Sequence, residues 1–192
     1  MLKIVILISG QGSNMEAIIK NCQAGKVDGK VELVISNKED APGLKAAQDL
    51  GIKTAFKKTE DEIIAEADKV RPDLICLAGY MKIVSPKFIR AYRNKIINIH
   101  PALLPAFPGL QVQKKALEHG VKFSGCTVHF VDEGCDTGPI IRQAVVPVLE
   151  GDTEESLSER ILKEEHRIYS EAIQLIAQNK LSIEGCIVHV KE

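Results

Sequence analysis

The sequence lacks tryptophan altogether and has only three tyrosines and five phenylalanines among 192 residues. Few aromatic rings are therefore available to stack bases, which argues against binding of single-stranded nucleic acid. An excess of one charge is lacking too, because 25 Lys and Arg residues stand against 26 Asp and Glu residues. A general nucleic-acid or anionic-membrane binder would carry a clear basic excess, so we expect neither partner.

Cysteine pairs and long apolar runs are also missing. The five cysteines are scattered, odd in number and without a Cys-x-x-Cys pair. This pattern argues against a disulfide framework and a zinc ribbon, so we expect no metal and a reducing, cytoplasmic location. The first apolar run, residues 4–8, ends at Ser9 and is too short for a signal-peptide core or a membrane span.

What the sequence has is a regular alternation of apolar and amphipathic segments. The pattern predicts strands at 4–8, 31–35, 53–56, 74–78 and 95–100, separated by helices at 14–24, 44–50, 61–70 and after Pro86. It continues with a strand pair at 123–131 and 140–148 and one long helix at 153–178. We expect an α/β fold in a single domain, with an open, mostly parallel twisted sheet, antiparallel C-terminal strands and a long C-terminal helix.

A glycine-rich loop follows the first predicted strand. Gly10 and Gly12 allow a sharp turn, while Ser13, Asn14 and the free amides of the next helix offer donors that suit a phosphate. Met15 stands where a dinucleotide-binding loop has its third glycine, which favours one phosphate monoester on a small substrate. A tight turn with a capped helix explains the same residues without a ligand.

Asn98 and His100 end the fifth predicted strand and, being two residues apart, project to the same face. Asn98 offers a neutral donor to an oxygen that becomes negative, and His100 can move a proton near neutral pH. Three prolines, at 101, 105 and 108, stiffen the segment that follows. The alternative is a core histidine bonded to a backbone carbonyl, with Asn98 as a turn residue.

Two further places carry unexpected carboxylates. The loop 132–139, flanked by His129, contains three of them, and one could orient His100, although a solvated turn explains them equally. Glu165 falls within the apolar stripe of the last helix and should need a cationic partner. That partner is either internal, Arg142 or Arg167, or an ammonium group of a substrate.

Taken together, these segments resemble the folate-dependent phosphoribosylglycinamide formyltransferases over nearly the whole chain. The carriers of the resemblance are ISGQGSN at 8–14, LAGYMKI at 77–83, NIHPALLP at 98–105 and DTGP at 136–139. The resemblance implies a Rossmann-like formyltransferase fold, with a phosphate-binding half at 1–100 and a catalytic and folate half at 101–192. It also implies transfer of the formyl group of the co-substrate 10-formyltetrahydrofolate to the amine of glycinamide ribonucleotide, by a monomer or homodimer without a metal.

The resemblance assigns roles to matching positions. It implies a catalytic group of Asn98, His100 and Asp136; phosphate binding by Gly12, Ser13, Asn14, Met15 and Glu16; amine binding by Glu165; and folate binding by Met81, Lys82, Ile83, Val84 and Asn98, with the loop residues Asp132, Glu133, Gly134 and Cys135. Cys135 is not expected to act as a nucleophile, because no cation near it in sequence would activate the thiol.

One departure and two alternatives remain. Where the family has a longer stretch with an arginine facing the folate tail, this chain has Lys57 and Lys58, and either lysine could substitute as a point charge. A formyltetrahydrofolate deformylase would share the Asn98, His100 and Asp136 group but would not need the glycine loop. A non-catalytic nucleotide-phosphate binding module would need the loop but not the group.

Overall fold

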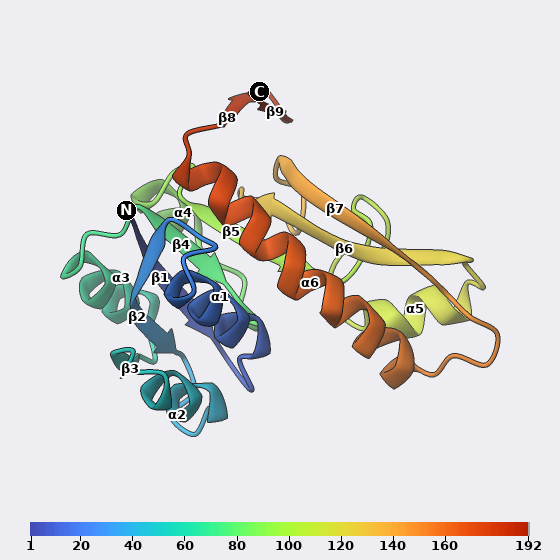
Figure 1. Ribbon diagram of the computed structural model, residues 1–192, viewed down its shortest axis with the longest axis horizontal. Coiled ribbons are helices and arrows are strands. Elements are labelled where there is room, and N and C mark those ends of the chain that lie inside the picture. Colours follow the sequence, from blue (N-terminus) through green and yellow to red (C-terminus); the bar gives the residue numbers. More distant parts are fainter. Residues whose placement is uncertain (192) are drawn as a thin grey trace.

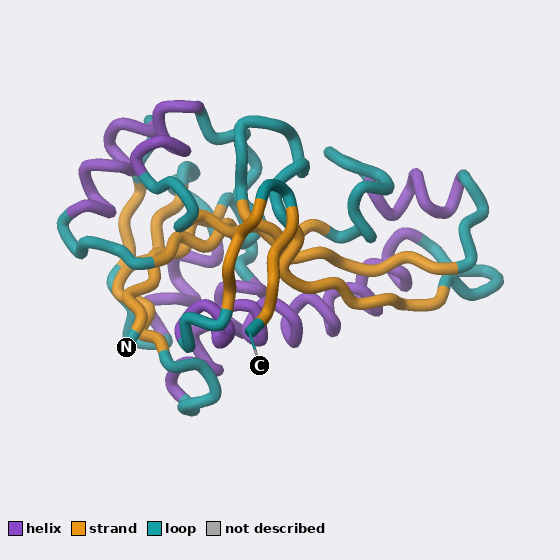
Figure 2. Tube along the Cα trace, turned by 90° about the horizontal axis from the view of Figure 1, so that it is seen from above, coloured by secondary structure: helices purple, strands orange, loops and turns teal. Residues whose placement is uncertain are grey.

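The alternating segments form one nine-stranded sheet with helices on both faces (Figures 1 and 2). The computed structural model describes residues 1–191. The strands are β1 (Leu2–Ile8), β2 (Gly29–Ser36), β3 (Thr54–Phe56), β4 (Leu74–Leu77), β5 (Ile96–His100), β6 (Phe123–Phe130), β7 (Ile140–Pro147), β8 (Leu181–Glu184) and β9 (Ile187–Val190). The helices are α1 (Ser13–Gln23), α2 (Pro42–Asp49), α3 (Glu60–Asp68), α4 (Pro86–Ala91), α5 (Val112–Glu118) and α6 (Glu154–Ala177).

The strand order confirms the predicted sheet. It runs β3-β2-β1-β4-β5-β6-β7-β9-β8, with the first five strands parallel and β6 antiparallel to both of its neighbours. The continuous apolar run of β1 is explained by burial on both faces. Ile4, Ile6 and Ile8 pack with residues of α1, α2 and α6, whereas Val5 and Leu7 pack with residues of α3 and α4.

Two features were not predicted. Helix α5 has only seven residues and begins after Gln111 (φ 57°) without a side-chain cap, so its sequence carries no helix start signal. The C-terminal hairpin β8–β9 is made of two four-residue strands that are largely exposed. It joins the sheet through a single residue pair, Ile140 with Ile187. Because neither strand has a buried apolar face, the sequence lacks the pattern by which a strand is predicted.

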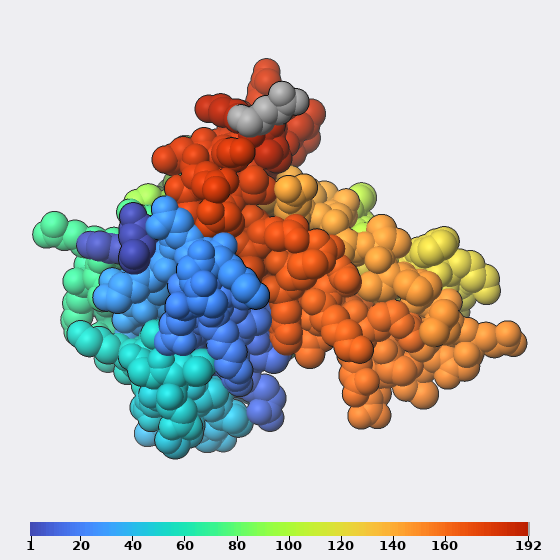
Figure 3. Space-filling view, in the orientation of Figure 1, coloured from blue at the N-terminus to red at the C-terminus, as the bar shows by residue number. Residues whose placement is uncertain are grey.

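On one face of the molecule, helix α6 lies between α1 and β7 and packs against both (Figure 3). A capping box formed by Thr153 and Ser156 begins the helix. The Tyr169 hydroxyl is buried within hydrogen-bonding distance of two backbone carbonyl oxygens, of Leu77 at 3.0 Å and of Ile97 at 3.2 Å. The side chain thereby ties α6 to the ends of β4 and β5. Among the described residues no helix, not even α6, combines the length and apolarity needed to cross a membrane.

Tyr169→Phe should lower the free energy of unfolding by about 1–2 kcal/mol, because both carbonyls lose a buried donor. Urea denaturation followed by circular dichroism measures the change. Tyr80→Phe is the matched control, since the Tyr80 hydroxyl makes no hydrogen bond within residues 1–191. Equal stability of the two variants would show that the Tyr169 hydroxyl does not hold α6 in place.

Candidate active site

A cavity opens where the strand order reverses. From β1 the chain passes to β2 on one side, and from β4 it passes to β5 on the other. Ligands of open α/β sheets bind at such a point, outside the carboxyl ends of the strands. Here the cavity has a volume of about 370 Å³, and its lining consists of Ser9, Gly10, Gln11, Gly12, Ser13, Asn14, Lys38, Ala78, Gly79 and Met81.

The glycine loop presents three free backbone donors to this cavity. Gly12 has φ 81°, and a Cβ there would lie 2.8 Å from the Met15 Cε atom, so the position requires glycine. The first hydrogen bond of α1 runs from the Glu16 amide to the Gly12 carbonyl at 2.9 Å. The amides of Ser13, Asn14 and Met15 precede that bond and have no partner within the helix, which makes the loop suitable for an anion.

The residues predicted to hold the phosphate differ in what they can offer. The Met15 side chain is fully buried in the core, so only its amide is available. The Glu16 amide is used by Gly12, and its carboxylate pairs with Lys20 at 2.9 Å. Glu16 is therefore the one predicted phosphate residue with no free donor.

Of the two kinds of cationic partner that the sequence left open for Glu165, the internal one, Arg142 or Arg167, is not paired with it among the described residues. Arg167 instead pairs with Glu164 and Glu171, at 2.5 and 2.7 Å. The buried Glu165 carboxylate accepts a hydrogen bond from the Asn14 side chain, with 2.7 Å between Nδ2 and Oε2. Burial raises the pKa of Glu165, and the Asn14 bond opposes that shift. The Asn14 Oδ1 atom is buried without a partner among the described residues, so the pair has acceptor capacity for a donor from a ligand.

Asn98, His100 and Asp136 come together at the carboxyl end of β5, through direct contacts and through His129. Asn98 pairs in the sheet with Leu77, the residue before the lining residues Ala78 and Gly79. The His100 Nδ1 atom lies 3.4 Å from Asp136 Oδ2. The other ring nitrogen, Nε2, lies 2.9 Å from the Phe107 carbonyl oxygen, which can only accept a hydrogen bond. Nε2 therefore carries a proton, and a second proton on Nδ1 would be stabilised by the Asp136 carboxylate.

Local backbone conformation aims the Asp136 carboxylate. Asp136 has φ 56°, and its Oδ2 atom accepts a hydrogen bond from the Gly109 amide at 2.9 Å. Two residues on, a Cβ at Gly138 would lie only 1.8 Å from the Phe130 carbonyl oxygen, so the turn requires glycine there. Asp132 has a different role, since it accepts bonds from the Gly134 amide and the Thr137 hydroxyl and folds the loop.

The residues predicted to bind folate are of two kinds. Met81 and Ile83 expose 68% and 82% of their surfaces, and Met81 is also part of the cavity lining. Val84 is buried among α3 and α4 residues and can offer only its backbone. The Lys82 ammonium donates to the Lys58 carbonyl, which joins the two segments. Lys57 is paired with Glu66 at 3.2 Å, so of the two candidate lysines its charge is already engaged.

At the tip of the 132–139 loop, Glu133 and Cys135 are exposed. Glu133 lies 3.8 Å from Arg90 of α4. Partial burial and the neighbouring Asp136 carboxylate raise the pKa of the Cys135 thiol. The thiol is thus not activated as a nucleophile. Within residues 1–191, no group of His, Cys, Asp and Glu side chains is arranged to hold a metal ion.

Sequence reasoning missed one member of the cluster, His129. Its Nε2 atom lies 3.3 Å from Asn98 Nδ2 and 3.8 Å from Asp136 Oδ1. The sequence marks His129 only as a flank of the acidic loop. The missing information was the register of β6 against β5, which places His129 directly opposite Asn98.

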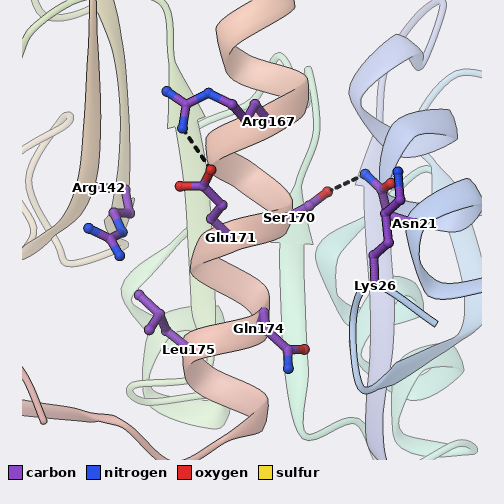
Figure 4. Close-up of a pocket in the computed structure, with 8 residues that line it drawn as sticks. All are labelled: Asn21, Lys26, Arg142, Arg167, Ser170, Glu171, Gln174 and Leu175. Carbon is purple, nitrogen blue, oxygen red and sulfur yellow. Dashed lines mark hydrogen bonds and ion pairs between the residues drawn. The ribbon is translucent and has the colours of Figure 1, made fainter. Parts of the chain in front are cut away.

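A second hollow, of about 480 Å³, lies along α6 (Figure 4). Its side chains are largely engaged with one another: Asn21 donates to Ser170 at 2.8 Å, and Arg167 pairs with Glu171 at 2.7 Å. None of the residues predicted for the active site lines it, whereas the cavity at the strand reversal joins several of them.

Comparison with known proteins agrees with this geometry. Residues 2–173 match the family described as formyl transferase. The chain is 44% identical to phosphoribosylglycinamide formyltransferase of Escherichia coli (strain K12), over 95% of this chain and 90% of that protein. It superposes with a TM-score of 0.98 on glycinamide ribonucleotide transformylase 1 from Symbiobacterium toebii, at 49% identity over 100% of this chain and 95% of the other.

A second solved structure gives the same result. The phosphoribosylglycinamide formyltransferase from Anaplasma phagocytophilum is 44% identical and superposes with a TM-score of 0.96, covering 100% of this chain and 94% of its own. Both superpositions thus extend over the whole of this chain. The chain belongs to the formyl transferase family and, within it, groups with the phosphoribosylglycinamide formyltransferases.

Proposed function

We propose that this enzyme transfers the formyl group of 10-formyltetrahydrofolate to the amine of glycinamide ribonucleotide, in purine synthesis. The observation that carries the proposal is the convergence of Asn98, His100 and Asp136 at the end of β5, next to β4, whose following turn lines the cavity together with the glycine loop. A hydrolytic deformylase has no need of that loop, and a phosphate-binding module has no need of the cluster.

The ribonucleotide would bind across the cavity from the glycine loop to Glu165. The free amides of Ser13, Asn14 and Met15 suit its phosphate, supported by the partial positive charge at the start of α1. The Glu165 carboxylate and the unpartnered Asn14 Oδ1 atom suit its amine, because a primary amine donates hydrogen bonds whether it is protonated or neutral. The phosphate of the substrate would thus meet the backbone amide of Asn14, and the amine would meet the Asn14 side chain.

The folate would bind on the other side of the catalytic cluster. The exposed side chains of Met81 and Ile83 offer apolar surface to a flat ring, and the 132–135 segment forms the facing loop. Lys58 is the better candidate for the folate tail, because Lys57 is paired with Glu66. When bound, 10-formyltetrahydrofolate supplies the formyl carbon.

The chemistry of the cluster suits acyl transfer without a covalent enzyme intermediate. Attack of an amine on a formyl carbon places negative charge on the formyl oxygen. The Asn98 amide would donate to that oxygen. The second donor would be the Nδ1–H of a protonated His100, because Nε2–H is taken by the Phe107 carbonyl, and Asp136, 3.4 Å from Nδ1, would stabilise the charged ring. His100 can then move a proton toward the leaving nitrogen. The raised pKa of the Cys135 thiol is in keeping with a direct transfer.

Within this proposal residues 1–100 supply the phosphate site, Asn98, His100 and the 81–84 segment of the folate site, whereas residues 101–192 supply the catalytic loop with Asp136 and the 132–135 segment of the folate site. All five cysteines are unpaired, which supports a reducing compartment such as the cytoplasm. We expect a monomer or a homodimer.

The deciding assay incubates the purified enzyme with 10-formyltetrahydrofolate, with and without glycinamide ribonucleotide. Release of tetrahydrofolate that depends on the ribonucleotide would support the transferase. Release at the same rate without it would identify a deformylase, and no release with retained phosphate binding would identify a binding module.

Asn98→Ala should lower kcat by roughly 100- to 1000-fold, because one donor to the developing oxyanion is lost. Steady-state kinetics of tetrahydrofolate release measures the effect. Asn21→Ala, which removes a partly buried asparagine far from the cluster, is the control and should leave kcat unchanged. A loss below about tenfold in a folded Asn98→Ala enzyme would exclude the oxyanion role.

Glu165→Gln should raise the KM for glycinamide ribonucleotide by roughly 10- to 100-fold, since a hydrogen bond from the amine to a charged acceptor is replaced by a neutral one. Because burial raises the pKa of Glu165, the wild-type carboxylate is lost as pH falls through that raised value. The wild-type KM should therefore increase toward acidic pH, while the KM of the variant stays flat.

Glu164→Gln is the control for this experiment, because Glu164 is adjacent on α6 but pairs with Arg167 at the surface. It should leave the KM and its pH dependence as in the wild type. Similar KM values for the Glu164 and Glu165 variants would rule out Glu165 as the amine acceptor.

A further inference from the structure

His129 is the fourth side chain of the catalytic cluster, and its ring is in contact with Asn98. It lies on β6 directly opposite Asn98 of β5, with 2% of its surface exposed. The pairing of β6 with β7 is irregular between Val128 and His129. Irregularities of this kind bend a strand and re-aim a side chain, and they are common beside active sites.

The backbone determines which nitrogen of His129 carries the proton. Nδ1 lies 2.8 Å from the Phe130 carbonyl oxygen, which can only accept, so Nδ1–H donates to it. In the neutral ring Nε2 is then an acceptor, and it faces the Asn98 Nδ2 atom at 3.3 Å. The Asn98 amide donates to His129, not the reverse.

The ring is held in this neutral form. Burial lowers the pKa of His129, and the charge of His100 acts in the same direction. The Phe130 carbonyl and the carboxylates of Asp136 and Asp132 oppose the shift without reversing it. These are the charged and titratable groups that face the ring, from β5 and from the loop after β6.

A neutral acceptor at this point selects one orientation of the Asn98 amide. If the amide turned over, its Oδ1 atom would face the Nε2 lone pair, and two acceptors would meet in a buried site. With Nδ2 toward His129, one N–H is engaged and the second remains to donate. The second N–H is the one that the proposed mechanism needs.

We propose that His129 is a positioning residue that holds the Asn98 amide with its free N–H available to the formyl oxygen. The inference rests on the proposed function and adds to it a residue that acts only through Asn98. His100 and His129 thereby have different roles. In the proposed mechanism His100, which is paired with a carboxylate, carries a second proton, whereas His129 acts only while its Nε2 atom is unprotonated.

Two substitutions of His129 distinguish the loss of its hydrogen-bond acceptor from a mere change in side-chain size. His129→Gln reaches the Nε2 position with an amide oxygen and keeps the acceptor, whereas His129→Asn reaches only the Nδ1 position and loses it. We expect His129→Asn to lower kcat by roughly 10- to 100-fold with little change in either KM, as a misplaced catalytic group does. His129→Gln should retain kcat within about threefold of the wild type, since its acceptor replaces Nε2.

The same substitutions in the Asn98→Ala enzyme supply the decisive control. If His129 acts through Asn98, His129→Asn should lower kcat by less than about threefold in that background, because coupled residues are not additive. Ser124→Ala, a buried polar change on the same strand, should leave kcat unchanged in both backgrounds. Circular dichroism and thermal unfolding establish that each variant is folded.

The outcomes distinguish this inference from the proposed function. Equal losses in the two backgrounds, equal activity of the Asn and Gln variants, or a large rise in both KM values would overturn the positioning role while leaving formyl transfer intact. Absence of ribonucleotide-dependent transfer by the wild type would overturn the proposed function itself. A full effect of His129→Asn that vanishes without Asn98 would support both.

Discussion

The divergence of the chain after β1 and β4 is the constraint on which the rest of this molecule depends. Two neighbouring parallel strands send their connections to opposite sides, so their carboxyl ends leave a gap that neither connection fills. One wall of the gap is the start of α1, and the other is the turn after β4. Tyr169 of α6 connects the two strands beside the gap, since its hydroxyl lies within hydrogen-bonding distance of the Leu77 carbonyl of β4 and the Ile97 carbonyl of β5.

In the catalytic cluster, backbone carbonyls determine which nitrogen of each histidine ring carries the proton. The Phe107 carbonyl puts a proton on Nε2 of His100, and the Phe130 carbonyl puts one on Nδ1 of His129. Consequently the nitrogen that remains for another contact is Nδ1 in His100 and Nε2 in His129. The other nitrogen of each ring then faces a different neighbour, since Nδ1 of His100 lies by the Asp136 carboxylate and Nε2 of His129 lies by the Asn98 amide.

Much of the fold could be predicted from the sequence, because buried parallel strands such as β1 are marked by continuous apolar runs. Helix α5 could not be predicted, since it begins after Gln111 without a side-chain cap. The β8–β9 hairpin could not be predicted either, since its strands bury too few apolar side chains to produce an alternating sequence pattern. Asn98 and His100 were found because two-residue spacing on a strand specifies a face. Finding His129 required cross-strand register, and the Asn14 partner of Glu165 required contact between residues 151 positions apart.

The bond between Asn14 and Glu165 has a consequence for sequence variation. The backbone of Asn14 belongs to the glycine loop at the start of α1, while its side chain donates to the buried carboxylate of α6. These two contributions can change independently, because every residue except proline carries the backbone N–H. A substitution at position 14 would therefore alter the surroundings of Glu165 while it leaves the donors of the loop in place.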